Sequence, residues 1–441
     1  MNLRSAGHFV SRLAQKLRNS RRRGACSVEI ADLLGRKPIN LDTPELQRFL
    51  AGKVILVTGA GGSIGSEICR QTMKFCPARI ILIDRAENAL FEIDRELRER
   101  WVGADIVPVV ADITDQKRIE QVFQSFRPQV VFHCAAHKHV PMMEANPGEA
   151  VKNNIFGTKI VADATLAIGA SAFVMVSTDK AVNPTSVMGA TKRVAELYVQ
   201  SLNSCGLRVA SCELKPSHSP ATHNSQLATS NSQPATRFLA VRFGNVLGSS
   251  GSVVPIFRKQ IEAGGPVTVT HPEMRRYFMT IPEASQLVMQ AGAIGQGGEI
   301  FVLDMGEPIR ILDLAMEMIQ RAGLRLEDDI QIKITGIRPG EKLYEELAAD
   351  NEQTRPTSHA KIRVWQLPRA TAQQVNRMLS GLEQVVDSPR QRVMGMLHAC
   401  LSAEYTPDTP VDTPPTLDIS INTEIEDQAA ELRRLVKAQA A

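Results

Sequence analysis

The chain has 441 residues, of which 43% are hydrophobic and 22% are charged, so its composition is that of a folded globular protein and excludes a disordered or fibrous chain. The formal net charge at pH 7 is only +4, which argues against a nucleic-acid binder. The seven cysteines form no C-x-x-C pair and show no metal-ligand spacing, so we expect free thiols in a reducing compartment and no bound metal.

The N-terminal residues 1–24 carry seven Lys or Arg residues and no acid. The simplest interpretation is a solvated, flexible arm. The alternative is a peripheral contact with anionic lipid headgroups, through an apolar stripe of Phe9, Val10, Leu13 and Leu17. No stretch approaches the roughly 18–20 apolar residues that span a bilayer, and the arm lacks the apolar core of a secretory signal. We therefore expect a cytoplasmic protein that is, at most, peripheral to a membrane.

Short apolar runs alternate with longer amphipathic stretches from Lys53 onward. The runs predict strands at 53–57, 79–83, 106–110, 129–133, 172–177 and 238–243. This alternation predicts an α/β fold with a doubly wound parallel sheet and helices on both faces. Beyond about residue 250 the pattern is mixed, with a helix near 280–294, a strand at 299–303 and a helix near 309–322, which indicates a smaller C-terminal lobe.

Two polar segments interrupt this pattern. Residues 212–236 are rich in Ser, Thr, Asn, Gln, Pro and His and contain almost no large apolar side chains. Such a segment cannot bury enough surface to offset its ordering entropy, so we expect a disordered surface insertion there. Residues 404–441 begin rich in Pro, Thr and Asp, and we expect little order in that tail either.

The first predicted strand runs into a glycine-rich turn, K-V-I-L-V-T-G-A-G-G-S-I-G-S-E-I from Lys53. Gly59, Gly62 and Gly65 are three residues apart, and Ser63 and Ile64 begin the following helix. A tight turn of this kind lets the backbone approach a pyrophosphate, whose charge is stabilised by the amides at the helix N-terminus. The turn therefore predicts a site for a nicotinamide dinucleotide.

The ends of the next strands supply further candidates for the same site. Asp84 ends the second strand, at about the distance where an acid accepts hydrogen bonds from the adenosine ribose. A carboxylate there disfavours a 2′-phosphate, although the adjacent Arg85 can tolerate one, so NAD is favoured over NADP. The remaining candidates are Asp112 and Ile113 after the third strand and Ala135 and Ala136 after the fourth. Simple turn chemistry is the alternative interpretation of the two aspartates.

The stretch F-V-M-V-S-T-D-K-A-V-N-P-T-S-V-M-G-A-T-K-R at 173–193 places Thr178, Asp179 and Lys180 at the carboxyl edge of the sheet, where active sites of open α/β folds lie. Met188 and Lys192 are predicted one turn apart on the next helix. In short-chain dehydrogenases this pair is Tyr and Lys, and the Tyr transfers protons. None of the four tyrosines of the chain precedes a Lys by four residues. Either the site is inactive, or other residues carry out its acid–base chemistry.

These residues resemble the CapD/WbpM-type polysaccharide-biosynthesis dehydratases, extended short-chain dehydrogenases/reductases that convert UDP-N-acetylglucosamine to its 4-keto-6-deoxy derivative. Other stretches with the resemblance are H-K-H-V-P-M-M-E-A-N-P (137–147), N-N-I-F-G-T (153–158), R-F-G-N-V-L-G-S-S-G-S-V-V-P-I-F (242–257), H-P-E-M-R-R-Y-F-M (271–279) and R-P-G-E-K-L-Y-E-E-L (338–347). The resemblance covers roughly residues 27–350, apart from the polar insertion. Many members carry transmembrane helices before this domain, so we expect this chain to correspond to the soluble part.

The resemblance implies an internal redox cycle in which hydride leaves carbon 4 of the sugar and returns at carbon 6, from which water has left. It implies that Asp179 is the acid, that Lys180 is the base at carbon 5 and that Thr178 hydrogen-bonds near the carbon-4 oxygen. Lys192 is expected to hold the nicotinamide ribose. Lys180 can act as a base only if its pKa falls by several units from about 10.4. The acceptor of the carbon-4 hydroxyl proton stays open between Asp179 and an ordered water.

The UDP-sugar itself requires fixed cations and amide donors around its diphosphate. Arg258 and Arg276 are the best candidates, with a plain surface charge as the alternative for Arg276. Glu341 either meets the uridine ribose or caps a helix. The full set of candidate substrate-binding residues is Lys138, His139, Asn245, Arg258, Arg276 and Glu341. His139 is expected to line the pocket rather than to bind a metal.

Three other functions compete with the 4,6-dehydratase: a dehydratase that also epimerises carbon 5, a 4-epimerase, and a non-catalytic regulator that binds NAD or a UDP-sugar. Met188 argues against the first two, because inverting relatives and 4-epimerases usually keep the Tyr. The intact Thr-Asp-Lys argues against the regulator. Relatives form dimers or larger assemblies, so we expect a homo-oligomer with interface helices around 147–167 and 185–204.

These observations divide the chain into six segments. The expected division is a basic arm (1–24), a lead-in segment (25–50), an NAD-binding Rossmann domain (51–250), a sugar-nucleotide-binding lobe (251–350), a helical extension (351–403) and a mostly disordered tail (404–441).

Overall fold

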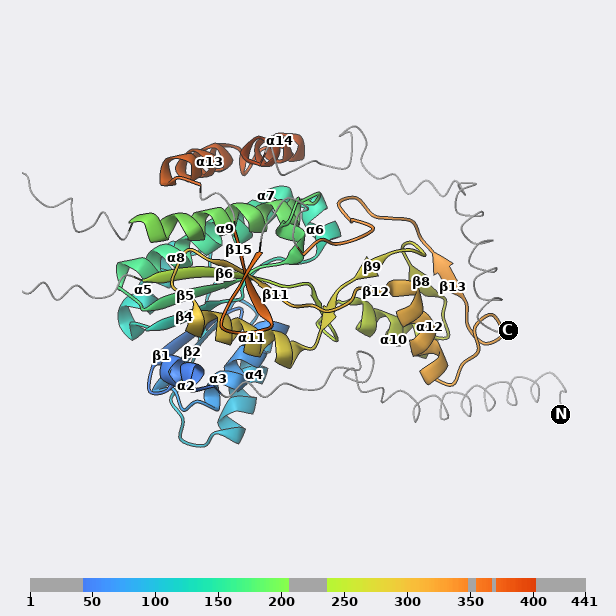
Figure 1. Ribbon diagram of the computed structural model, residues 1–441, viewed down its shortest axis with the longest axis horizontal. Helices are drawn as coiled ribbons and strands as arrows, with labels where there is room; N and C mark the ends of the chain where they lie inside the picture. The colour runs from blue at the N-terminus through green and yellow to red at the C-terminus, as the bar shows by residue number, and fades with distance from the viewer. Residues whose placement is uncertain (1–42, 206–235, 348–353, 367–369, 402–441) are drawn as a thin grey trace, which may run out of the picture.

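The computed structural model describes residues 43–205, 236–347, 354–366 and 370–401 (Figure 1). The basic arm, most of the lead-in segment, the C-terminal tail and all of the polar insertion except Thr236 lie outside these residues.

Within the described ranges, a nine-stranded sheet forms the centre of the larger part of the molecule (Figure 1), with the strand order β14-β15-β11-β6-β5-β4-β1-β2-β3. All neighbours from β11 to β3 are parallel. The first six strands are β1 (Val54–Thr58), β2 (Arg79–Asp84), β3 (Ile106–Val110), β4 (Val130–His133), β5 (Ala172–Val176) and β6 (Arg237–Arg242). They coincide with the six apolar runs, so the predicted doubly wound parallel sheet is confirmed.

Helices cover both faces of this sheet, which explains why its strands are apolar throughout rather than alternating. One face packs against α2 (Pro44–Leu50), α3 (Ser63–Met73), α4 (Glu87–Arg100) and α11 (Ile281–Ile294). The other face packs against α5 (Gln116–Phe126), α8 (Thr158–Ala167) and α9 (Val187–Cys205). Between β4 and α8 lie the short helices α6 (Val140–Ala145) and α7 (Pro147–Ala150) and a π-helical stretch, Val151–Gly157. None of the helices in the described ranges is long and apolar enough to span a bilayer.

A smaller lobe lies beside the carboxyl end of the sheet (Figure 1). It contains α10 (Val253–Ala263), α12 (Ile311–Arg321) and the paired strands β8 (Val267–Val269) and β13 (Ile332–Ile334), around an apolar core of its own. Two short pairs connect it to the sheet: β7 (Asn245–Val246) with β10 (Phe278–Met279), and β9 (Arg275–Arg276) with β12 (Ile309–Arg310).

The lobe is not the uninterrupted stretch 251–350 that we expected. Between its two parts the chain returns to the large sheet, where α11 packs on α3 and β11 (Ile300–Leu303) pairs with β6. The apolar pattern predicted the helix near 280–294 and the strand at 299–303, but such a pattern carries no information about which sheet a strand joins.

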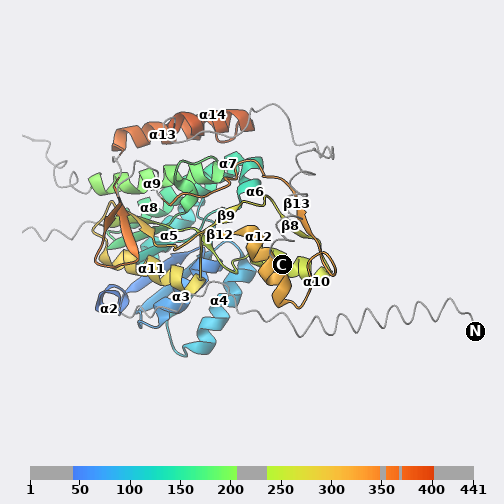
Figure 2. The ribbon, with the colours of Figure 1, turned by 45° about the vertical axis from the view of Figure 1, so that its right-hand side comes forward.

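The expected helical extension at 351–403 begins with two strands, β14 (Thr354–Pro356) and β15 (Ile362–Trp365), which add to the sheet in antiparallel fashion. Helices α13 (Ala372–Val385) and α14 (Arg390–Cys400) then lie across the outer side of α9 (Figures 1 and 2). As a result, every residue of α9 from 187 to 202 is buried within one chain. The helix at 185–204 that we expected at a subunit interface is therefore covered by the chain's own C-terminal helices.

A fully buried ion pair joins α9 to the sheet. Arg242 donates its Nε to Glu196 Oε1 at 2.6 Å and its Nη2 to Oε2 at 2.5 Å. Ser177 Oγ donates to the same Oε1 at 2.6 Å, and the Arg242 guanidinium lies 3.5 Å from the centroid of the Trp365 ring. Because charges at this depth are stable only when paired, these contacts fix the ends of β5 and β6 relative to α9.

Replacement of Glu196 by Ala leaves the Arg242 charge without its carboxylate partner. We expect the free energy of unfolding, measured by urea denaturation, to fall by about 3–5 kcal/mol. Glu99→Gln, at an exposed position on α4, is the control and should change it by less than about 0.5 kcal/mol. Equal stability of the two variants would contradict a structural role for this ion pair.

Candidate active site

The turn between β1 and α3 is packed directly against the end of β4. A Cβ on Gly59, whose φ is +67°, would lie 2.7 Å from the backbone nitrogen of Ala135. A Cβ on Gly65 would lie 2.0 Å from the Gly59 carbonyl oxygen. Both positions therefore require glycine, and the first amides of α3 are held close to the carboxyl end of the sheet.

A cleft at this end of the sheet brings together most of the residues predicted to bind the cofactor. Its lining includes Gly59, Gly62, Asp84, Arg85, Asp112, Ile113, Ala135 and Ala136. Ser63, Ile64 and Gly65 form the first turn of α3 beside it. The cleft lies where the strand order changes direction between β1 and β4, which is the usual position of a ligand in doubly wound sheets.

Asp84 and Arg85 occupy different electrostatic surroundings in this cleft. The Asp84 carboxylate accepts hydrogen bonds from the backbone nitrogens of Gly61 and Ala86, both at 2.9 Å. The Arg85 guanidinium lies 3.5 Å from Asp112 and 3.9 Å from Glu149. The cation that would be needed for a 2′-phosphate is thus already surrounded by two acids.

Asn154 is a site residue to which the sequence analysis assigned no role. From the π-helical stretch, its Oδ1 accepts from the His137 backbone nitrogen at 2.8 Å, and its Nδ2 donates to the His137 carbonyl at 3.1 Å. Nδ2 also reaches Thr191 Oγ1 on α9 at 3.1 Å. Asn154 therefore holds the chain after β4 in place beside the cleft. The motif N-N-I-F-G-T contained the signal, since a buried Asn needs several partners.

His133, at the end of β4, is buried below the cleft between two threonines. Its Nδ1 lies 2.8 Å from Thr58 Oγ1 and its Nε2 lies 2.9 Å from Thr158 Oγ1. Burial, with a smaller contribution from the charge of Lys192, lowers the pKa of His133 to about 3. The imidazole is therefore neutral at physiological pH and links β1, β4 and α8 through hydrogen bonds.

The predicted Thr-Asp-Lys motif follows β5 as a short turn at the same edge. Thr178 Oγ1 donates to Asp179 Oδ1 at 2.9 Å, and Lys180 Nζ donates to the same oxygen at 3.0 Å. The Asp179 side chain is fully buried, yet its Oδ2 has no hydrogen-bond partner among the described residues. Lys180 also donates to Asn245 Oδ1 at 3.2 Å, which places Asn245 beside this cluster.

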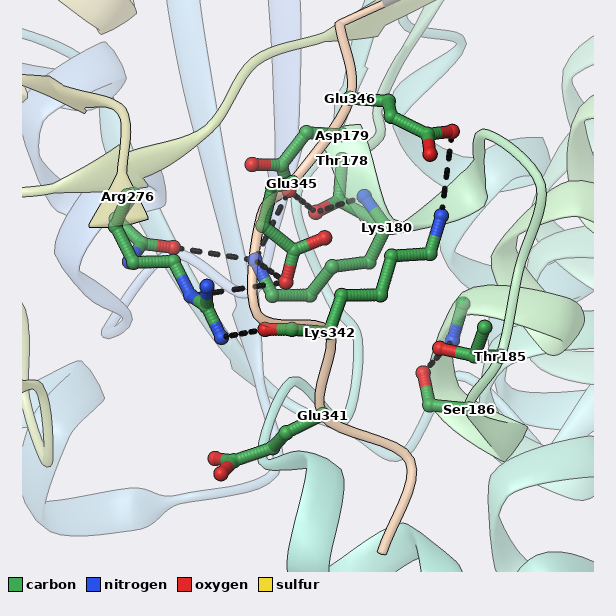
Figure 3. A network of polar contacts seen from close by, with 12 residues as sticks. Thr178, Asp179, Lys180, Thr185, Ser186, Arg276, Glu341, Lys342, Glu345 and Glu346 are labelled. Carbon is green, nitrogen blue, oxygen red and sulfur yellow. Dashed lines mark hydrogen bonds and ion pairs between the residues drawn. The ribbon is translucent and has the colours of Figure 1, made fainter. Parts of the chain in front are cut away.

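Glu345 completes the cluster, and the sequence analysis did not single it out. Its side chain is only 4% exposed, and its Oε1 lies 3.7 Å from Lys180 Nζ and 3.7 Å from Arg276 Nε (Figure 3). Burial lowers the pKa of Lys180, but the carboxylates of Asp179 and Glu345 outweigh this effect and raise it above its ordinary value. The lowered pKa that we expected for a base is therefore not found in this structure, because two acids surround the ammonium group.

Met188 and Lys192 lie on α9, with Met188 in the apolar core. Burial lowers the pKa of Lys192 to about 8, although Glu196 and Cys134 oppose the shift. A thioether carries no exchangeable proton, so Met188 cannot replace the tyrosine in proton transfer.

The structure places the six candidate substrate-binding residues in different environments. Lys138 donates to Ser249 Oγ at 3.3 Å, and the His139 ring lies against Gly251. The Nε of Arg258 on α10 is buried without a partner among the described residues. Lys138 and His139 therefore contact the loop that precedes α10, and Arg258 lies on α10 itself.

The side chains of Arg276 and Glu341 both contact groups of the chain itself. The Arg276 guanidinium donates to the carbonyls of Arg275 at 2.7 Å, Lys342 at 2.7 Å and Leu343 at 3.2 Å, so it is bound to the chain's own groups rather than open to a diphosphate. Glu341 accepts from Arg338 Nε at 3.0 Å within its own turn. No helix begins at this turn in the described residues, so Glu341 does not cap one. Figure 3 shows the Glu341 carboxylate apart from the Lys180–Glu345 contact.

A family model described as "Polysaccharide biosynthesis protein" matches residues 55–367. The chain belongs to this polysaccharide biosynthesis protein family. Its Staphylococcus aureus relative, the capsular polysaccharide biosynthesis protein CapD, is 56% identical over 326 residues, which are 74% of this chain and 50% of CapD. The chain thus spans about half the length of that relative.

Nucleotide-sugar enzymes are among the more distant relatives of this chain. A Campylobacter jejuni protein named UDP-N-acetylglucosamine 4,6-dehydratase (inverting) is 32% identical over 304 residues, which are 68% of this chain and 79% of that protein. The solved structure of Pen from Bacillus thuringiensis has a TM-score of 0.62 and 33% identity, covering 73% of this chain and 92% of Pen. The chain is therefore related to nucleotide-sugar dehydratases, and the resemblance noted in its motifs is confirmed.

The burial of His133 predicts a dependence of stability on pH. Its pKa is about 3 in the folded state and about 6.5 in the unfolded state, so below pH 6.5 the unfolded chain binds a proton that the folded chain does not. The free energy of unfolding therefore decreases as the pH falls, by roughly 2 kcal/mol between pH 6.5 and pH 4.5 for this residue.

His133→Asn should remove this part of the pH dependence while keeping a polar side chain at the site. We expect the free energy of unfolding of the variant to fall less between pH 7 and pH 4.5 than that of the native chain, as measured by urea denaturation at both pH values. An identical fall in the two proteins would show that His133 is not held neutral.

Proposed function

We propose that the chain is a UDP-N-acetylglucosamine 4,6-dehydratase that forms UDP-4-keto-6-deoxy-N-acetylglucosamine for polysaccharide biosynthesis. The observation that carries the proposal is the buried Thr178–Asp179–Lys180 cluster, in which one carboxylate oxygen of Asp179 has no partner among the described residues. A buried, unpartnered carboxylate oxygen beside a lysine provides an acid and a base at one place. Family membership supports a role in polysaccharide biosynthesis. The dehydratase relative supports the 4,6-dehydration itself, but it is named as an inverting enzyme, so the unchanged configuration at carbon 5 rests on Met188 in place of the tyrosine.

The proposed cofactor is NAD, and the geometry of the cleft supports it. The glycine turn has no room for side chains at Gly59 and Gly65, so backbone amides can approach a pyrophosphate. The Asp84 carboxylate lies at the end of β2, while Arg85 is surrounded by Asp112 and Glu149, so a 2′-phosphate would meet negative charge. Lys192, from α9, is the proposed partner of the nicotinamide ribose. A nicotinamide cofactor held there would supply the hydride acceptor for carbon 4 of the sugar and the hydride donor for carbon 6.

The chain's own residues then have to move two protons. Asp179 takes the proton of the carbon-4 hydroxyl and delivers it to the carbon-6 hydroxyl, which leaves as water. Lys180, once it has lost the proton of its ammonium group, removes the proton from carbon 5 and returns it there. Asp179 likewise ends each cycle as it began. Thr178, which donates to Asp179 Oδ1, is proposed to hydrogen-bond near the carbon-4 oxygen. Asp179 carries the carbon-4 hydroxyl proton because the Met188 thioether has no exchangeable proton.

Several residues are proposed to hold the UDP-sugar. Arg258, with a buried Nε that lacks a partner among the described residues, is the proposed cation for the diphosphate, with Lys138 and His139 beside it. Asn245, which accepts from Lys180, is proposed to lie at the junction of sugar and phosphate. Arg276 is proposed to act on Glu345 rather than on the diphosphate, since its donors already face carbonyl oxygens and that carboxylate.

The reaction is tested by incubating the chain with UDP-N-acetylglucosamine and NAD in deuterated water and following the sugar by proton NMR. We expect a 4-keto-6-deoxy product with unchanged configuration at carbon 5. Asp179→Asn and Lys180→Ala should each lower kcat by at least about 10²-fold, as expected when an acid or a base is removed. An inverted carbon 5 would assign the chain to the epimerising dehydratases, and binding without turnover would indicate a regulator.

The choice of cofactor is tested with Asp84→Asn, which keeps the shape of the side chain and removes its charge. We expect the ratio of the Kd for NADP to the Kd for NAD to fall by roughly tenfold, the effect of about one charge pair near the surface. Calorimetric titration measures both constants. Asp105→Asn, at the opposite edge of the sheet before β3, is the matched control. A ratio unaffected by Asp84→Asn would remove the argument for NAD.

A further inference from the structure

Lys180 lies between two buried carboxylates that come from distant parts of the chain. Asp179 is its neighbour in sequence, with Oδ1 at 3.0 Å from Nζ, whereas Glu345 approaches from the segment after β13, with Oε1 at 3.7 Å. The fourth charged group in the cluster is Arg276, from β9, which faces Glu345 at 3.7 Å (Figure 3). The proposed mechanism gives a task to Asp179 and to Lys180 but leaves Glu345 without one.

The placement of Glu345 is held by several contacts of the segment 338–347. Lys342 Nζ donates to the Val182 carbonyl at 3.1 Å, just after the Thr-Asp-Lys turn, and Arg276 Nη2 donates to the Lys342 carbonyl at 2.7 Å. Gly340 lies against Ser186 and Glu144, so closely that a Cβ there would be 2.7 Å from a Glu144 oxygen. The approach of Glu345 to Lys180 is therefore part of how this segment docks on the site.

A base at carbon 5 must first lose its own proton. Lys180 is an ammonium ion in this environment, since it donates to Asp179 and Asn245 and faces Glu345. Asp179 cannot take that proton during the reaction, because in the proposed mechanism it holds the proton of the carbon-4 hydroxyl. Glu345 is the other carboxylate within 4 Å of Nζ in the part of the chain that the structure describes.

We propose that Glu345 accepts the proton of Lys180 and so makes Lys180 the base at carbon 5. Glu345 thus acts as a positioning residue that works through Lys180. This inference rests on the proposed function. In the step itself, an N–H bond of Nζ breaks and an O–H bond forms on a Glu345 oxygen, so an ammonium–carboxylate pair becomes an amine–carboxylic acid pair. No electrons are transferred, and the proton returns when Lys180 has reprotonated carbon 5.

The surroundings favour this transfer once water is excluded. Both side chains are largely buried, and a neutral pair is favoured over a charged pair when a bound substrate removes the remaining solvent. Burial raises the pKa of Glu345, helped by Asp179 and opposed by Lys180, Arg276 and Lys342. When Glu345 becomes neutral, Arg276 keeps its hydrogen bonds to three carbonyls, and Lys342 keeps the carboxylate of Glu346.

The inference is tested with Glu345→Gln in the full chain, using the pH dependence of kcat. In the native enzyme the proton moves within the pair, so kcat should vary little around neutral pH. In the variant, Lys180 has to release its proton to solvent. We expect kcat at pH 7 to fall roughly 10²-fold and to recover as the pH is raised, with an unchanged Kd for NAD. Unchanged kcat at pH 7, or an equal loss at every pH, would overturn the inference.

The neighbouring Glu346 provides a matched control. It is more exposed and pairs with Lys342 and Asn183 instead of Lys180, so Glu346→Gln should keep the native kcat and pH profile. Glu345→Asp retains a carboxylate at a greater distance. We expect it to keep the flat pH profile with a kcat about tenfold lower, and native kcat in this variant would count against the inference. Thermal unfolding of each variant shows whether the fold is kept.

A second measurement does not depend on turnover. Lys180 is modified with an amine-reactive reagent at several pH values with NAD bound, and the rate is followed by mass spectrometry. Because only the neutral amine reacts, this rate reports the charge of Nζ. Loss of the Glu345 carboxylate should move the midpoint of this curve to lower pH, and an unchanged midpoint overturns the inference. If the native chain forms no product while the midpoint does shift, the Lys180–Glu345 pair stands and the proposed reaction fails. If product forms but Glu345→Gln behaves like the native chain, only this inference fails.

Discussion

The buried carboxylate of Glu196 is the contact on which the geometry of the site depends. It binds Arg242 at the end of β6 and Ser177 at the end of β5, and it projects from α9 one turn after Lys192. Ser177 is followed at once by Thr178, Asp179 and Lys180. The position of the reactive turn relative to the helix that carries Met188 and Lys192 is therefore set by one ion pair, with Trp365 from β15 packed over the Arg242 guanidinium.

The site is also completed by a segment that returns from far along the chain. After the smaller lobe has formed its own core, residues 338–347 cross back to the edge of the large sheet and bring Glu345 to Lys180. The charged groups of the site thus come from two parts of the chain. The sheet edge presents a buried acid and lysine, and the returning segment supplies a second acid that balances the charges of Lys180 and Arg276. Because the cluster holds two carboxylates and two cations, a proton can move from Lys180 to Glu345 without a change in its net charge.

The C-terminal helices have a further structural consequence. Because α13 and α14 lie on α9, the outer side of this helix is buried within a single chain. Sequence reasoning expected that surface to serve an interface between subunits, by analogy with relatives. The amphipathic pattern of a helix shows that it needs cover, but it does not show whether the cover comes from the same chain or from another one.

The sequence by itself determined the first six strands of the sheet and the glycine turn beside the cleft, because both depend on local patterns. Apolar runs bounded by turn residues predicted β1 to β6. The spacing of Gly59, Gly62 and Gly65 predicted the turn after β1. In that turn Gly59 and Gly65 have no room for a side chain, and Gly62 directly precedes the first residue of α3. The position of Asp179 and Lys180 after a buried strand also followed from local order, since all parallel strands end at one edge.

Only the tertiary structure decided the charge of Lys180 and the partners of Arg276. Both depend on Glu345, which is 165 positions from Lys180 along the chain, and on carbonyl groups whose direction no side-chain pattern reveals. The same holds for Asn154 and His133, whose roles arise from hydrogen bonds to three different elements. Electrostatic interactions act through space, so residues that lie far apart in the sequence become neighbours only when the chain has folded.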